Sequence, residues 1–217
     1  MLVMKFGGSS TGDRECLSAA IVAVLDAART EKVIVVVSAV GRTTDRLVDH
    51  LENRLSESDV VTSLLEIHEH VLDALEPEAR ERTRDRLLNY ERTYRGSTEA
   101  ERLAFGERLA SDAFRSLLAA AGTPAVDVGF EVVAMKPDGT VDLDATRERF
   151  VAVGFDGASP EVLVVGGFAG TTSDGRLELL GRGGSDTTAT SIGAALDARK
   201  VELWKTVDGV HCTDPLT

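Results

Sequence analysis

Residues 32–38 read KVIVVVS, a run of five consecutive β-branched residues without polar alternation. A strand of this kind fits a parallel sheet that is covered on both faces. Before it, residues 2–6 form a short apolar run that ends at Gly7 and Gly8, and a helical pattern follows. The apolar positions of that pattern are Leu17, Ala20, Ile21, Val24, Leu25 and Ala28. Strand, glycine turn, helix and buried strand make a βαβ unit, which predicts an α/β fold.

The rest of the chain extends this unit into one predicted domain over residues 1–217. Residues 45–122 show no comparable strand and predict a helical excursion, with one helix opening at Pro77 and another over 100–121. Strands are expected at 125–128, 161–165 and 201–207, with a hairpin turn at 173–176 and small helices at 144–153 and up to Ala198. We therefore expect a three-layer αβα sandwich around a mostly parallel sheet.

Composition excludes several classes of protein. Aspartate and glutamate number 36 against 24 for lysine and arginine, a net charge of −12, which argues against a nucleic-acid partner. The sequence contains no run of 18 consecutive apolar residues, so we expect no membrane-spanning helix, and because a strand is predicted from residue 2 we expect no targeting peptide. The two cysteines cannot form a disulfide framework, so we expect a cytoplasmic protein. The acidic surface suits either a salt-rich cytoplasm or the codon bias of a GC-rich genome.

Two glycine turns each follow a strand and precede a helix, at Gly7-Gly8 and at residues 181–185. Glycine allows the backbone to approach a ligand, and amides at a helix N-terminus favour anions. Each turn lies beside a cation, Lys5 or Arg182, which favours phosphate binding over a purely structural turn. The sequence around Glu107, taken alone, predicts a solvent-exposed glutamate on a helix. The four histidines show no metal-ligand spacing, so no protein metal site is expected.

Four segments together resemble the aspartate kinases, a group of amino-acid kinases. They are KFGGSS at 5–10, FGERLAS at 105–111, GRGGSD at 181–186 and WKTVDGVHCTDP at 204–215. The resemblance spans the whole chain and implies the amino-acid kinase fold. It implies ATP-dependent phosphorylation of the side-chain carboxylate of L-aspartate, the first step towards lysine, threonine and methionine. ATP and Mg²⁺ would be the cofactors, and we expect a homo-oligomer.

The resemblance also implies roles for individual residues. Lys5 and Asp186 would act at the reaction centre, where Lys5 neutralises charge on the transferred group. The residues implied for aspartate are Ser38, Thr43, Glu107, Arg182 and Ser185. The residues implied for the nucleotide are Lys5, Gly7, Gly8, Ser9, Gly183, Gly184, Lys205, Thr206 and His211. Glu107 would take the α-ammonium group of aspartate, which reverses its reading as a solvated residue.

The implied chemistry suits these residue types. A carboxylate is already ionised at pH 7, so the reaction requires charge compensation and positioning more than a general base. Thr206, His211 and Leu216 depart from the usual pattern, and the resemblance implies further kinase residues and ACT regulatory domains beyond residue 217. We therefore expect aspartate binding with weak Mg·ATP binding. A non-catalytic subunit that binds aspartate or a partner chain is the alternative.

Overall fold

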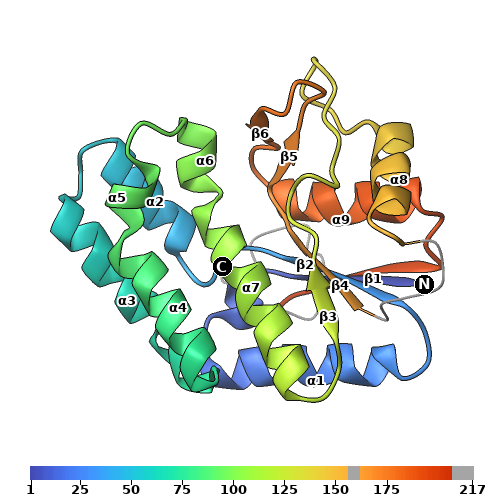
Figure 1. The fold of residues 1–217 in the computed structure, drawn as a ribbon, viewed down its shortest axis with the longest axis horizontal. Helices are drawn as coiled ribbons and strands as arrows, with labels where there is room; N and C mark the ends of the chain where they lie inside the picture. The colour runs from blue at the N-terminus through green and yellow to red at the C-terminus, as the bar shows by residue number, and fades with distance from the viewer. Residues whose placement is uncertain (156–161, 207–217) are drawn as a thin grey trace, which may run out of the picture.

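The computed structural model describes residues 1–155 and 162–206, and its centre is a parallel sheet (Figure 1). The strands lie in the order β3-β4-β2-β1-β7, and every pairing in this sheet is parallel. Their bounds are β1 Leu2–Phe6, β2 Val33–Val37, β3 Ala125–Asp127, β4 Val162–Gly166 and β7 Lys200–Trp204. Every residue of β1, β2 and β4 is buried, as the unbroken apolar run of β2 predicts.

Helices cover both faces of the sheet and confirm the predicted three layers. Helices α1 (Arg14–Ala28) and α7 (Phe105–Ala120) pack on one face, and α8 (Leu143–Ala152) and α9 (Gly184–Ala195) on the other (Figure 1). Helix α1 begins where the Asp13 side chain accepts a hydrogen bond from the Cys16 amide at 2.8 Å. Within 1–155 and 162–206, no helix is long and apolar enough to cross a membrane.

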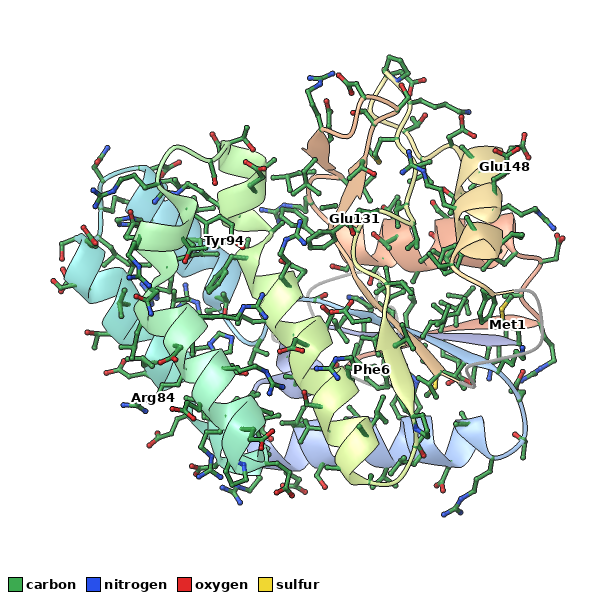
Figure 2. The ribbon with its side chains drawn as sticks, viewed as in Figure 1. Met1, Phe6, Arg84, Tyr94, Glu131 and Glu148 are labelled. Atoms are coloured by element: carbon green, nitrogen blue, oxygen red, sulfur yellow. The ribbon has the colours of Figure 1, made fainter. Side chains whose placement is uncertain are left out.

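The helical excursion lies at the end of the sheet to which the strands point (Figure 1). It comprises α2 Thr43–Leu51, α3 Glu57–Ala74, α4 Pro77–Leu88, α5 Tyr90–Tyr94 and α6 Glu99–Leu103. These helices bury a separate apolar cluster that includes Leu64, Tyr90 and Phe105. The Tyr90 and Phe105 rings lie 4.8 Å apart, and the Tyr94 ring, labelled among these helices in Figure 2, lies 5.5 Å from Tyr90 and 5.4 Å from Phe105. The excursion is therefore a packed subdomain.

Two predicted helices end differently in the structure. The helix expected over 100–121 is divided at Ala104 into α6 and α7, and α6 has its own capping box at Thr98. The division lies beside Gly106, which packs against Ala39, so the chain turns where the helix meets the loop after β2. Helix α9 ends at Ala195, three residues before the predicted end at Ala198, and Asp197 takes a left-handed φ of 51° there.

The predicted hairpin is present, and one arginine of α8 ties it to that helix. Strands β5 (Ala169–Thr171) and β6 (Leu177–Leu179) pair antiparallel. The Arg149 guanidinium of α8 donates to the Thr171 carbonyl at 3.1 Å, to its hydroxyl at 2.8 Å and to the Thr172 carbonyl at 3.4 Å. It also donates to the carbonyls of Glu131 at 2.9 Å and Val133 at 3.3 Å. Arg149 thus fixes the hairpin and the segment after β3 to α8.

Candidate active site

A cavity of about 300 Å³ opens at the carboxyl ends of β1 and β2, between the sheet and the helical excursion. Ligand sites of open α/β sheets lie at this edge because the loops after the strands converge there. The loop after β2 forms one wall and residues 181–186 form another. The side chains of Lys5, Glu107 and Phe168 line the space between them. The structure thus brings three of the four sequence motifs to one cavity.

Lys5 lies near the end of β1, and its side chain is only 9% exposed. Its Nζ is 2.6 Å from Oδ1 of Asp186, and Nζ of Lys205 is 3.2 Å from Oδ2 of the same carboxylate. Partial burial raises the pKa of Asp186, but hydrogen bonds and charge from Lys5 and Lys205 outweigh it and hold that pKa below its ordinary value. The two lysines and Asp186 form a charged cluster, of which Lys5 and Asp186 line the cavity.

The two glycine turns approach this cluster from different elements. At Gly8 a Cβ atom would lie 2.7 Å from the Ala39 carbonyl oxygen and 2.8 Å from that of Gly41, so only glycine fits between the loops. Gly183 precedes α9 with a left-handed φ of 75°, which again favours glycine. Helix α9 therefore begins at the cavity, where its N-terminal dipole favours an anion.

Glu107 lies in the first turn of α7 and is 3% exposed. Its Oε1 accepts a hydrogen bond from the Ala39 amide at 3.0 Å, whereas its buried Oε2 has no hydrogen-bond partner among the described residues. Burial raises the pKa of Glu107 from 4.5 to about 7, despite the Ala39 hydrogen bond and the charge of Lys5. A buried carboxylate with one unpaired oxygen at a cavity is suited to a cationic ligand group.

The other residues implied for aspartate occupy different positions around the cavity. Ser38, Arg182 and Ser185 line it, with Arg182 exposed at the rim. Thr43 is fully buried, and its hydroxyl donates to the Val40 carbonyl at 2.7 Å. It does not line the cavity, whereas the next residue, Thr44, does. The hydroxyl available on this side is therefore that of Thr44.

The residues implied for the nucleotide are more dispersed. Gly8, Gly183 and Gly184 line the cavity, and Gly7 lies beside Lys5, since a Cβ there would be 3.4 Å from Lys5 Nζ. Ser9 is exposed in the 3₁₀ turn after β1 and does not line it. Lys205 and Thr206 border a separate hollow of about 150 Å³ beside Trp204. His211 and Leu216 lie outside the described residues.

Two contributors to the cavity escaped the sequence analysis. Phe168 has a left-handed φ of 72°, uncommon for an aromatic residue, and its side chain lines the cavity. Ala39 contributes its backbone amide to Glu107. The sequence does not identify Phe168 or Ala39 as site residues, because a backbone conformation or a main-chain donor does not require a distinctive side chain. The glycines at 166 and 167 indicate a turn before Phe168, but not that its side chain lines a cavity.

Burial of Glu107 predicts a stability that depends on pH. Between pH 4.5 and about 7 the unfolded chain ionises at this carboxyl before the folded chain does, so the free energy of unfolding falls as pH rises. Across this whole pH range the free energy of unfolding falls by roughly 3 kcal/mol because of Glu107. We expect Glu107→Gln to raise the melting temperature of the ligand-free protein at pH 8, with a smaller gain at pH 4.5. The matched control is Glu66→Gln on the exposed surface of α3, and equal melting curves for both variants at pH 8 would contradict the prediction.

Close packing at Gly106 predicts a second effect on stability. A Cβ at this position would lie 2.5 Å from Ala39 Cβ and 2.9 Å from Thr43 Cγ2. We expect Gly106→Ala to destabilise the fold by about 1–3 kcal/mol despite the better helix propensity of alanine, because overpacking must displace the loop that donates to Glu107. Chemical denaturation measures this, with Ser116→Ala on the same helix as control. A stabilised Gly106→Ala variant would show that the loop yields freely.

The described residues contain no group of three or more histidine, cysteine or acidic side chains that could hold a metal ion. The carboxylates that line the cavity are Glu107 and Asp186, and Asp186 is paired with two lysines. Magnesium commonly keeps several waters and binds through one or two carboxylates plus substrate phosphates. This donor set fits a magnesium ion that arrives with a nucleotide and is held mainly by its phosphates.

Comparison with known proteins defines the family. The family model described as the amino acid kinase family matches residues 1–217. The chain belongs to the amino acid kinase family. Among curated members, it is 31% identical to aspartokinase 1, chloroplastic, of Arabidopsis thaliana over 98% of this chain and 41% of that protein. It is 29% identical to aspartokinase 2 of Bacillus subtilis over 99% of this chain and 44% of that protein.

Solved structures of the family share the fold. The crystal structure of E. coli aspartokinase III in complex with aspartate and ADP superimposes with a TM-score of 0.83 and 26% identity. The match covers 100% of this chain and 51% of that one. The chain therefore spans about half the length of the relatives that it matches, and the sheet order and its helical layers agree with the amino acid kinase fold that the sequence predicts.

Proposed function

We propose that this chain is the catalytic part of an aspartate kinase. It would transfer the γ-phosphoryl group of Mg·ATP to the side-chain carboxylate of L-aspartate, giving 4-phospho-L-aspartate and ADP. The observation that carries the proposal is Glu107, a buried carboxylate whose Oε2 lacks a partner among the described residues and which lines the same cavity as Lys5. Similarity to aspartokinases over nearly all of the chain supports the same activity.

Each side of the cavity supports one part of this reaction. Glu107 would pair with the α-ammonium group, while Arg182 would bind the α-carboxylate and Ser38 and Thr44 would add hydroxyl contacts. One oxygen of the aspartate side chain attacks the γ-phosphorus, and the bond from that phosphorus to the bridging oxygen of ADP breaks. No proton moves, because the nucleophile is already ionised. Lys5 would neutralise the charge that develops on the transferred group.

The nucleotide would lie on the glycine side of the cavity. Gly8, Gly183 and Ser185 would supply backbone amides for the phosphates, whereas the Gly184 amide donates to the Gly181 carbonyl at 2.9 Å. Magnesium, when bound, neutralises part of the phosphate charge. Asp186 lies 2.6 Å from Lys5 and 3.2 Å from Lys205, and by holding both cations it would position them for the phosphates. The homo-oligomer expected from the sequence remains a prediction.

A trapping assay tests the proposed function. Hydroxylamine converts an acyl phosphate into a hydroxamate, so the chain with Mg·ATP and L-aspartate should produce aspartyl hydroxamate. Succinate has the same two carboxylates and lacks the ammonium group, so it should react at least tenfold more slowly if Glu107 recognises that group. Aspartate binding by calorimetry without any hydroxamate would instead favour a non-catalytic aspartate-binding subunit. Absence of both would overturn the proposal.

A further inference from the structure

A second hollow of about 300 Å³ lies on the other side of α7 and shares no lining residue with the cavity described above. Arg82 and Arg86 reach it from α4, and Arg108 reaches it from α7. Phe130 and Gly166 border it from the sheet side. We refer to it as the arginine hollow. Two neighbouring residues of α7 thus line different cavities: Glu107 lines the first cavity, and Arg108 lines the arginine hollow.

The three arginines are weakly neutralised by their surroundings. Arg82 forms no ion pair with any residue of 1–155 or 162–206. Arg86 is 3.6 Å from the Asp112 carboxylate, and its side chain is 38% exposed. The Arg108 guanidinium stacks over the Phe130 ring at 4.6 Å and reaches the Glu131 carboxylate only at 4.0 Å, near the upper limit of an ion pair. Their N–H groups therefore remain available on the hollow side.

The carboxylates of the arginine hollow have partners of their own. Asp127 accepts hydrogen bonds from the Ser111 hydroxyl at 2.8 Å and from the Gly129 amide at 3.0 Å. Asp112 also lines the hollow, and its carboxylate pairs at 2.7 Å with Arg115, a residue that does not line it. Both carboxylates are therefore engaged, while the cations keep unused donors. An anion is the ligand that would complete this arrangement.

We propose that the arginine hollow binds a small phosphate-type oxyanion, either inorganic phosphate or a phosphate monoester. Arginine presents planar pairs of N–H donors that match phosphate oxygens, and here two helices present three guanidinium groups around one space. The contact of the Arg108 guanidinium with the Phe130 ring, 4.6 Å from its centroid, restrains the position of its donors. General attraction of anions does not explain such a cluster, since the chain as a whole carries a net charge of −12.

Binding is tested by titrating inorganic phosphate, and in a second arm glycerol 3-phosphate, at constant ionic strength with calorimetry and thermal shift. We expect the double variant Arg82→Gln, Arg108→Gln to bind at least tenfold more weakly. The matched control is Arg84→Gln, because Arg84 lies on the same helix but points away from α7 (Figure 2). It should bind phosphate like the parent chain.

A Lys5→Met variant separates this site from the main cavity, where phosphate could also bind. Phosphate binding that survives in Lys5→Met and disappears in the double arginine variant supports the arginine hollow. Binding that disappears in Lys5→Met and survives in the double variant overturns the proposal, as does an absence of phosphate-specific stabilisation in the parent chain. Equal melting temperatures of the double variant and Arg84→Gln without phosphate verify that both fold.

Discussion

Replacing Lys5 by methionine is expected to reduce the rate of aspartyl hydroxamate formation by about 10³-fold or more. Removal of one neutral oxyanion donor from an enzyme costs about 10²–10³ in rate, and Lys5 would carry a full charge at the transferred group. The 9% exposure of its side chain leaves little water to screen that charge. Methionine has a similar length and is apolar, so the packing of β1 should remain.

The informative control is Lys205→Met. Its Nζ lies 3.2 Å from the same Asp186 carboxylate, but its side chain is 37% exposed, so solvent screens its charge more strongly. We expect a loss well below that of Lys5→Met, measured as kcat under saturating Mg·ATP and aspartate. Equal losses for the two variants would mean that the charge of the whole cluster matters and that Lys5 has no special position.

Replacing Glu107 by glutamine is expected to weaken aspartate binding by about 2–5 kcal/mol, which is about 30-fold or more. Glutamine preserves the shape of the side chain and removes the charge that would meet the α-ammonium group. Binding of Mg·ATP should change little, because Glu107 would contact the ammonium group of aspartate and no phosphate. Calorimetric titration of both ligands measures the difference.

The stability measurement separates this result from general damage. We expect Glu107→Gln to be the more stable protein at pH 8, so weak aspartate binding by a more stable variant cannot result from unfolding. Succinate gives a second check, because the variant should bind succinate as well as the parent chain does. Unchanged affinity for aspartate would return Glu107 to a structural role at the Ala39 amide.

The sheet could be predicted from the sequence because unbroken β-branched runs have few alternatives to a buried parallel strand. The helical layers were expected from the same pattern, whereas the strand order and the register are seen only in the structure. The break between α6 and α7 at Ala104 could not be predicted, because residues 100–121 keep a helical apolar pattern through it. Just after the division Gly106 packs against Ala39, a contact between residues far apart in sequence that the helical pattern does not reveal.

The candidate site, too, was predicted only in part. Lys5, Glu107 and the loop at 181–186 were predicted from motifs, and the structure brings them to one cavity. Thr43 and Thr44 are indistinguishable by type, and only the turn at Val40 decides which hydroxyl lines the cavity. Phe168 was missed because its contribution depends on a left-handed backbone, which a sequence does not display for an aromatic residue.

The hydrogen bonds of Arg149 affect which segments of the protein unfold locally together. All the carbonyls that it holds belong to residues between 131 and 172, whereas the central sheet joins β1 to β7 from opposite parts of the chain. Arg149 therefore couples the hairpin, α8 and the segment after β3, so that a movement of one of them withdraws hydrogen bonds from the other two. We expect the amide hydrogens of the hairpin and of the segment after β3 to exchange with solvent faster, and together, when Arg149 is replaced by methionine. Phe168 directly precedes the hairpin, so each movement of the hairpin would also loosen one wall of the cavity.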